Sequence, residues 1–215
     1  MKNSILALVF IALTTISCKT DNKKVTTEEA VKAVKKVENP ISSYKANVAA
    51  SNITWKGSKP GGSHNGDIKI QNGLFDIENG IVKAGEFTID MTSINCLDLE
   101  AGKGKEKLEG HLKNVDFFDV EKFPTAKFVI TSAEVKDDKT QITGNLTLKA
   151  ITKSITIPVA IHNGENGAIN LKSDAFKIDR TEFGVTYSSK KLDAALKDKF
   201  IDDLIEISFD IQAKK

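Results

Sequence analysis

Cysteine is scarce in this 215-residue chain, and its scarcity excludes a disulfide-rich scaffold. The two cysteines are Cys18 and Cys96, and Cys18 directly follows an apolar N-terminal segment. If Cys18 is modified, Cys96 has no partner for an internal disulfide. The folded part must then be stabilised by its hydrophobic core, even in a compartment where disulfides persist.

Excess charge of one sign and long apolar runs are also absent. The net charge is +2, so charge does not argue for a nucleic-acid partner or for electrostatic attachment to a membrane. The apolar run at residues 5–13 is much shorter than the roughly 20 residues that a transmembrane helix needs. We therefore expect no nucleic-acid binding and no membrane-spanning helix.

The first 18 residues have the pattern of an export signal. Lys2 supplies a positive start, the apolar run follows, and Ser17 precedes Cys18. This arrangement resembles the signal of bacterial lipoproteins, in which the cysteine is acylated and becomes the first mature residue. We predict that residues 1–17 are a signal peptide, that Cys18 is lipidated, and that the protein lies on the periplasmic side of the cell envelope. An ordinary secretory signal with a chance cysteine is the alternative.

Sequence signatures of catalysis are missing. The chain has no G-x-S-x-G, H-E-x-x-H, Walker-type or dinucleotide-binding motif. Its histidines, His64, His111 and His162, do not pair at a local metal-ligand spacing, and His64 stands in a glycine-rich stretch typical of a flexible loop. We expect no enzyme, no metal and no cofactor. A lipid hydrolase would need Ser63 or Ser93 beside His64 or His111.

From about residue 46 the hydrophobic pattern has a period of two. Apolar residues alternate with polar ones over residues 87–91, 142–148, 155–161 and 205–211. This alternation predicts strands with one apolar and one solvated face. Hairpin turns are predicted at Asn72-Gly73, Asn79-Gly80, Asp137-Asp138 and Asn163-Gly164. Many short strands joined by tight turns indicate a sandwich or a barrel.

Two stretches depart from this alternation. Residues 105–114 have helical spacing, and residues 191–204 place four apolar side chains on one helical face. We predict short helices or ordered loops at a barrel mouth. Within the strands, Phe176 and Ile178 are out of phase with the preceding apolar residues, which suggests a bulge, and Pro158 suggests an irregular edge or seam.

Polar and charged residues predominate between the signal and the strands. We interpret residues 18–45 as the lipidated cysteine and a tether, and residues 46–215 as one folded domain. Thr26 and Glu29 could form a capping box for a short helix in the tether, which Asn39-Pro40 would end.

One segment resembles a known family. Residues 109–128 read EGHLKNVDFFDVEKFPTAKF, similar to the H-L-x-x-x-D-F-F-D-V-x-x-[YF]-P-x-x-x-F segment of the YceI-like family. Further similar segments follow the family's order along the chain: SNITW at 51–55, GLF at 73–75, SIN at 93–95, GNLTL at 144–148 with Thr152-Lys153, and DRTEFG at 179–184. The resemblance covers residues 44–215. Ser51 replaces the family's frequent histidine, and Leu108-Glu109-Gly110 replaces its Arg-Asp, which puts polar contacts there in doubt.

The resemblance implies an all-β fold, an eight-stranded antiparallel lipocalin-like barrel with one or two short helices in the connections. Some members of the family bind polyisoprenoid chains, which implies a long apolar lipid, of polyisoprenoid or isoprenoid-quinone type, as the partner in the lumen. The membrane would be a second partner through lipidated Cys18. The alternative is a structural or interaction module of the envelope with a side-chain-filled barrel. The sequence leaves the oligomeric state open, a dimer included.

The apolar positions of the alternating segments are the predicted ligand-binding residues of the lumen. They are Trp55, Phe75, Phe87, Ile89, Phe118, Phe128, Ile130, Leu146, Leu148, Ile155, Ile157, Phe176, Phe183, Ile207 and Phe209. Gly144 on the same face either leaves room for a ligand or allows tight packing. In the motif, Phe117 and Pro124 favour a role in the fold, whereas Phe118 and Phe128 suit either role.

Overall fold

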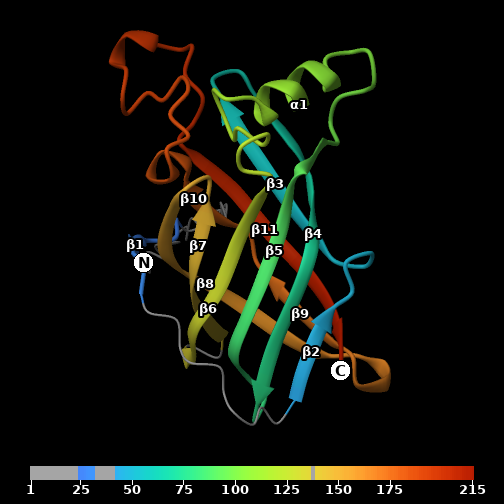
Figure 1. Ribbon diagram of the computed structural model, residues 1–215. Helices are drawn as coiled ribbons and strands as arrows, with labels where there is room; N and C mark the ends of the chain where they lie inside the picture. Colours follow the sequence, from blue (N-terminus) through green and yellow to red (C-terminus); the bar gives the residue numbers. More distant parts are fainter. Residues whose placement is uncertain (1–23, 32–41, 137–138) are drawn as a thin grey trace, which may run out of the picture.

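A closed antiparallel barrel forms the body of the protein (Figure 1). The computed structural model describes residues 24–31, 42–136 and 139–215. The signal segment, Cys18 and much of the predicted tether therefore lie outside the described residues. The described strands are β1 (Thr27–Glu29), β2 (Ser42–Ala46), β3 (Asn52–Lys59), β4 (Gly62–Glu78), β5 (Ile81–Cys96), β6 (Thr125–Lys136), β7 (Lys139–Leu148), β8 (Ile151–Asn163), β9 (Ile169–Ser173), β10 (Phe176–Asp179) and β11 (Leu204–Lys214).

Eight strands close the ring, as predicted. Each of β8, β7, β6, β5, β4, β3, β11 and β9 pairs with the next in this order, and β9 returns to β8. Two sides of the ring are each made of two pieces. β2 continues the side of β3, because it also pairs with β4 and β11, and β10 continues the side of β9 along β11.

The break between β9 and β10 is the predicted bulge. Ile169 and Leu171 face inward before it, and Phe176 and Ile178 face inward after it. Ser173 accepts a hydrogen bond from the Phe209 backbone N–H at 3.0 Å, and Phe176 is in register with Ile207. From residue 173 to 176 the chain advances three residues, while β11 advances only two, from 209 to 207. The extra residue reverses which side chains face inward.

Pro158 lies at a seam, also as predicted. One edge of β8 pairs with β7 along its length. The other edge pairs with β1 up to Ile155 and with β9 from Val159 onward. Pro158 lies between these two stretches of pairing. Its missing N–H therefore removes no hydrogen bond from the pairing with β1 or from the pairing with β9.

The turn predictions had mixed outcomes. Asn79-Gly80 connects β4 and β5 with positive φ at both residues, and Asn163-Gly164 begins the connection from β8 to β9. The prediction at Asn72-Gly73 was wrong, because both residues lie inside β4 beside a register shift. A Cβ on Gly73 would lie 2.5 Å from the Phe87 ring, so close packing explains this glycine. Asp137-Asp138 lies outside the described residues.

The helix expected in the tether was wrong where the structure describes it. Thr27–Glu29 forms β1 and pairs with β8 in antiparallel register. The Val25 side chain is buried, and its backbone N–H donates to the Lys177 carbonyl at 2.9 Å. Burial and backbone pairing outweigh a local capping signal here. Strand β2 also begins at Ser42, before residue 46, where we expected the folded domain to start. Its Tyr44 side chain is buried and stacks on Phe75.

Both interruptions of the strand pattern lie at the same end of the barrel (Figure 1). The first is α1 (Lys105–Lys113), as predicted. The second is an ordered loop whose one helical piece is a 3₁₀ turn at Ala194–Leu196. Its predicted apolar face is not buried there, since Leu192 is 60% exposed. Among the described residues, helices are too short or too polar to cross a membrane.

Candidate functional site

An inner cavity occupies the middle of the barrel. The space between its side chains, counted with the part that is open to solvent, measures about 700 Å³. Every side chain that lines it is apolar: Ile53, Ile70, Phe87, Ile89, Phe128, Ile130, Ile142, Leu146, Ile155, Ile157, Val159, Leu171, Phe176, Ile178, Phe209 and Ile211. A cavity with this lining offers a ligand no hydrogen bonds, so it suits hydrocarbon alone.

An outer cavity continues the inner one toward the end that carries α1. It measures about 1650 Å³ including its opening to solvent. Ile53, Ile89, Leu146 and Ile178 line both cavities, so the two cavities adjoin at these side chains and together make up the lumen. The lining remains largely apolar, and polar groups such as Ser58, Lys107 and His111 appear toward the mouth.

The strand parity predicted from sequence places most of the expected lumen residues correctly. The inner cavity is lined by Phe87, Ile89, Phe128, Ile130, Leu146, Ile155, Ile157, Phe176 and Phe209. The outer cavity is lined by Trp55, Phe118, Leu148 and Ile207, and also by Ile89 and Leu146. Contact of these side chains with a ligand stays a prediction.

Phe75 and Phe183 are the two exceptions, because they line neither cavity. Phe75 is 1% exposed and packs between Tyr44 and Phe87, with ring centroids at 5.7 and 5.9 Å. Phe183 is fully buried in the 3₁₀ turn Arg180–Phe183 that follows β10. Both rings belong to the packed hydrophobic core. Parity alone does not separate an inward side chain that lines a cavity from one that other side chains cover.

Several lining residues were missed although the alternation contained them. Ile53, Ile142 and Ile178 lie two positions from residues that the sequence had singled out, and all three line the inner cavity. Extending each strand's alternation by one more step finds them. Met91 of the outer cavity follows the same parity in β5. Ile68 is out of phase with Phe75, because β4 has a register shift between Ile70 and Asn72.

Gly144 serves tight packing. A Cβ at this position would lie 2.4 Å from Cζ of Phe128 and 2.8 Å from the carbonyl oxygen of Val129. The Phe128 ring therefore lies over the glycine, close to the wall. This placement keeps the ring out of the middle of the lumen while it still lines the inner cavity.

An aromatic cluster lies at the mouth. The His111 ring makes edge contacts with Phe117 at 5.7 Å and with Tyr187 at 4.7 Å between centroids. Phe117 also contacts Phe118 and lies under the Arg180 guanidinium. Phe117 is buried, as its expected role in the fold requires, although it also borders the outer cavity, as Phe118 does.

Arg180 is fully buried but is committed to the fold. Its guanidinium donates to the carbonyl oxygens of Val185, Ile201 and Asp202 at 2.8–3.1 Å and reaches the Asp203 carboxylate at 3.3 Å. Burial lowers the pKa of Arg180, and the neighbouring aspartates oppose this effect. These bonds hold both ends of the loop formed by residues 185–203, which we call the mouth loop. The Arg180 cation is therefore not free for a ligand head group.

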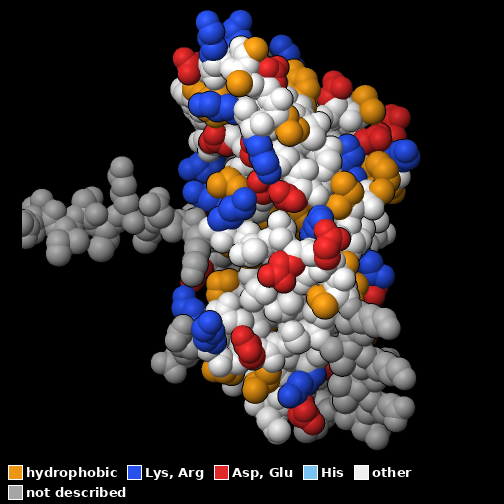
Figure 2. Space-filling view, turned by 90° about the vertical axis from the view of Figure 1, so that its left-hand side faces the viewer, with side chains coloured by type: hydrophobic (Ala, Val, Ile, Leu, Met, Phe, Trp, Pro, Cys, Tyr) orange, Lys and Arg blue, Asp and Glu red, His pale blue; other side chains and the backbone are white. Residues whose placement is uncertain are grey.

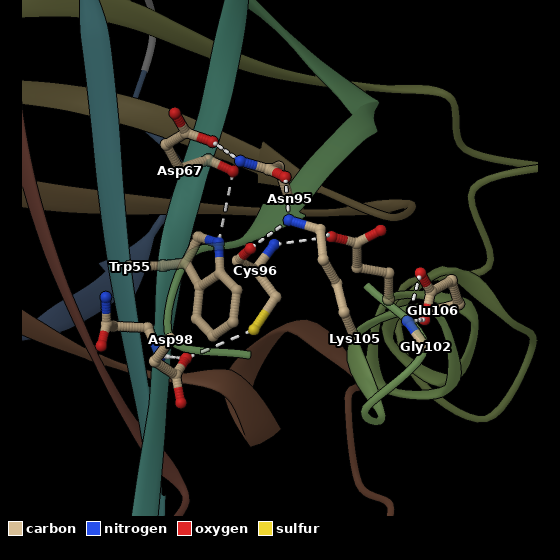
Figure 3. Close-up of polar contacts among 10 residues, drawn as sticks. Trp55, Asp67, Asn95, Cys96, Asp98, Gly102, Lys105 and Glu106 are labelled. Atoms are coloured by element: carbon tan, nitrogen blue, oxygen red, sulfur yellow. Dashed lines mark hydrogen bonds and ion pairs between the residues drawn. The ribbon is translucent and has the colours of Figure 1, made fainter. Parts of the chain in front are cut away.

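Glu109 and Ser51, which lie where the sequence departs from the family pattern, make polar contacts of their own. The Glu109 carboxylate accepts the Cys96 backbone N–H at 2.8 Å and pairs with Lys105 at 3.4 Å. Lys105 Nζ also donates to Asn95 Oδ1 and to the Cys96 carbonyl (Figure 3). These bonds attach α1 to the end of β5. Ser51 likewise bonds to the backbone of Gln212 in β11.

A second cluster of polar side chains lies at the rim of the barrel, beside the start of β4 and the end of β5. The Asp98 carboxylate accepts from His64 Nδ1 at 2.8 Å, from the Asn65 N–H at 2.8 Å and from the Cys96 thiol at 3.3 Å. Burial acts to raise the Asp98 pKa, but these bonds and the His64 charge together lower it to about 2. Burial raises the pKa of the Cys96 thiol. His64 belongs to β4, so the flexible loop expected there was wrong.

A serine–histidine pair of the kind that a hydrolase uses is not formed within the described ranges. The Ser93 hydroxyl donates to the Asp90 carbonyl and accepts the Lys69 backbone N–H. Ser63 borders the outer cavity beside His64, but among the described residues its hydroxyl makes no hydrogen bond to the His64 ring, which bonds to Asp98 through Nδ1. His111 makes ring contacts without a serine partner.

The sequence comparison decides the family. The YceI-like domain matches residues 44–213. The chain belongs to the YceI-like family. A UPF0312 protein of Pseudomonas putida is 31% identical over 147 residues, which cover 67% of this chain and 70% of the relative. Protein YceI of Salmonella arizonae is 36% identical over 83 residues, covering 39% and 40% of the two chains.

Solved structures share the YceI-like fold. BcnA of Burkholderia cenocepacia aligns with a TM-score of 0.62 at 18% identity, covering 78% of this chain and 98% of BcnA. A polyisoprenoid binding domain of Saccharophagus degradans aligns with a TM-score of 0.58 at 13% identity, covering 80% and 97%. The YceI protein of Campylobacter jejuni covers 96% and 99%, with a TM-score of 0.51 at 20% identity.

Proposed function

We propose that this YceI-like barrel binds a long apolar lipid of the polyisoprenoid or isoprenoid-quinone class in its lumen, and carries or sequesters it rather than acting on it chemically. The observation that carries this proposal is the all-apolar inner cavity that continues into the outer one through Ile89 and Leu146. The polyisoprenoid binding domain of Saccharophagus degradans, which shares the fold, supports the choice of ligand class.

Hydrocarbon burial alone supplies the affinity that such binding needs. Each Å² of apolar surface removed from water contributes roughly 25 cal/mol, so a chain of many isoprene units needs few polar contacts. Selectivity then depends on the length and width of the lumen, and on polar groups at the mouth such as His111 and Lys107. The Arg180 hydrogen bonds hold the mouth loop in place and so keep this opening defined.

The lipid anchor at Cys18 would place the barrel close to its membrane. Lys24 bridges to Lys177, and β1 pairs with β8 soon after. Six residue steps separate Cys18 from Lys24, and a fully extended chain covers about 3.5 Å per residue. The anchored barrel would thus stay within about 20 Å of the lipid surface, where a ligand leaving the bilayer has a short path to the barrel.

Charge on the outside of the barrel is mixed. On the face seen in Figure 2, Lys and Arg side chains alternate with Asp and Glu without a continuous patch of one sign. This surface suits a protein whose ligand lies inside the barrel, and the net charge of +2 agrees with it.

A plug at the junction of the two cavities tests the proposal. Leu146→Trp adds a bulky side chain where the inner and outer cavities meet. We expect organic extracts of the wild type, analysed by mass spectrometry, to contain a prenyl lipid at about one molecule per barrel. The extract of Leu146→Trp should lack it.

The matched control is Val135→Trp, which adds the same side chain to an exposed position of β6 and should retain the ligand. Circular dichroism must show both variants folded. If the wild type contains no lipid and takes up none from prenyl-lipid vesicles, the lumen proposal is wrong. Equal lipid in Leu146→Trp and in the control would also contradict it.

A further inference from the structure

Three potential metal ligands lie together at the rim: His64, Cys96 and Asp98. One ligand atom from each, His64 Nδ1, Cys96 Sγ and an Asp98 carboxylate oxygen, all lie within 4.8 Å of one another. His64 borders the outer cavity, whereas Cys96 and Asp98 line neither cavity, and the lipid-binding proposal gives none of the three a role. The combination of thiolate, imidazole and carboxylate is a set that zinc binds in proteins.

The strand register brings these residues together. Gly66 pairs with Cys96 across β4 and β5, and the Leu97 N–H continues the ladder by donating to the Asn65 carbonyl at 2.9 Å. Two further steps outward place His64 opposite Asp98. All three side chains then lie on one face of the ladder, because they share its parity. The cluster therefore belongs to a hydrogen-bonded scaffold, which suits a metal site.

The distances require small adjustments to admit an ion. Tetrahedral zinc, with bonds of about 2.0–2.3 Å, places its nitrogen, oxygen and sulfur ligands about 3.3–3.6 Å apart. The present separations are 2.8 Å from His64 Nδ1 to Asp98 Oδ2 and 3.3 Å from Cys96 Sγ to Asp98 Oδ1. The third separation, from His64 Nδ1 to Cys96 Sγ, is at most 4.8 Å. Side-chain rotations must therefore bring all three ligand atoms to metal-bonding distance.

The surroundings leave room for a fourth ligand. The Cys96 side chain is buried, and its sulfur points toward the Asp98 carboxylate beside the Trp55 ring (Figure 3). The His64 and Asp98 side chains are about a third exposed to solvent. An ion between the three would meet protein on the sulfur side and water on the other, the arrangement of a site with one open position.

We propose that His64, Cys96 and Asp98 form a binding site for a zinc-type divalent metal ion at the barrel rim. Binding replaces the thiol proton by the metal: the S–H bond breaks, the sulfur–metal bond forms, and the proton leaves to water. His64 gives up the Nδ1 proton that it donates to Asp98, either to water or by taking the tautomer with its hydrogen on Nε2, and binds through the Nδ1 lone pair. Asp98 contributes one carboxylate oxygen. No oxidant or reductant is needed, because the ion keeps its charge.

Cobalt titration tests the site, since Co²⁺ reports its own coordination by colour. The full chain is purified without an affinity tag, fully reduced, and carries Cys18→Ser so that Cys96 is its sole thiol. We expect one equivalent of Co²⁺ to produce a thiolate-to-metal charge-transfer band and the visible bands of tetrahedral cobalt. Added Zn²⁺ should then bleach both.

The variants distinguish ligands from bystanders. Cys96→Ser should abolish the charge-transfer band, and His64→Ala should weaken Co²⁺ binding by at least about tenfold. His162→Ala, which alters a histidine at the exposed end of β8, should bind like the parent. Circular dichroism confirms that each variant is folded. The proposal is overturned if the folded, reduced parent develops no band at millimolar Co²⁺, or if the band persists in Cys96→Ser.

Discussion

At the scale of single residues, glycines decide how the aromatic rings lie in the lumen. Gly144 lies under the Phe128 ring and Gly73 under the Phe87 ring. Each ring can lie close to the barrel wall because its neighbour has no side chain. The width of the inner cavity therefore depends as much on these glycines as on the aromatic residues that line it.

Gly144→Ala tests this packing. The added methyl group would lie 2.4 Å from Phe128 Cζ and 2.8 Å from the Val129 carbonyl oxygen, so the ring must move away from the wall. Overpacking of this kind costs about 1–3 kcal/mol. We expect denaturant unfolding to show that loss, while Gly62→Ala, whose Cβ would meet nothing within 4 Å, stays within about 0.5 kcal/mol of the wild type. Equal stability of the two variants would contradict this account.

At the scale of elements, α1 is attached by its first half and is weak in its second. Lys105 and Glu109 bond to the end of β5, whereas Gly110 lies in the helix interior with open space around it. The helix has no buried residue. Its stability therefore depends on these polar bonds, on the partial packing of Leu108 and Leu112 against the core, and on intrinsic helix propensity.

Gly110→Ala should accordingly stabilise the protein by about 0.5–1 kcal/mol, because alanine loses less backbone entropy in a helix. The matched control is Gly102→Ala, which also has open space but lies at φ +74°. There, an alanine is strained and should destabilise the protein. Thermal and denaturant melts measure both, and a destabilising effect of Gly110→Ala would refute this interpretation of α1.

At the scale of the whole molecule, Asp179 joins segments that are far apart in the chain. Its carboxylate caps the turn that follows β10 by accepting the N–H and hydroxyl of Thr181. It also pairs with Lys24 of the N-terminal segment at 3.3 Å and with Lys191 of the mouth loop at 3.6 Å. Burial acts to raise its pKa, but these bonds and charges outweigh burial, so the pKa is lowered from 3.8.

This shift predicts a pH dependence with a definite sign. The folded state holds the Asp179 proton less tightly than the unfolded state, so its contribution to stability is present above pH 3.8 and is lost as the pH falls below 3.8 through the folded pKa. Asp179→Asn should lower the free energy of unfolding at neutral pH and flatten its decline in acid. Unfolding curves between neutral and acidic pH measure this. An equally steep acid decline in Asp179→Asn would show that other groups are responsible.

Local pattern determined much of this protein. The two-residue alternation shows which side chains of each strand face inward, because successive side chains on a strand point to opposite faces. Residues 87–91, 142–148 and 205–211 follow it. The phase change before Phe176 predicts the bulge, and the spacing of residues 105–114 predicts α1. The DFFDV segment predicts the family, which the match over residues 44–213 confirms.

The tertiary structure decided what depends on partners far apart in sequence. Pairing of Thr27 with Ile155, and of β9 with both β8 and β11, comes from backbone bonds that carry no side-chain signature. Pairing of β2 with β4 covers Phe75 with Tyr44 and removes it from the lumen. Pairing of β4 with β5 brings His64 to Cys96 and Asp98. Parity is a property of one strand and can be deduced from sequence, whereas register is a relation between two strands and is set only when the barrel closes.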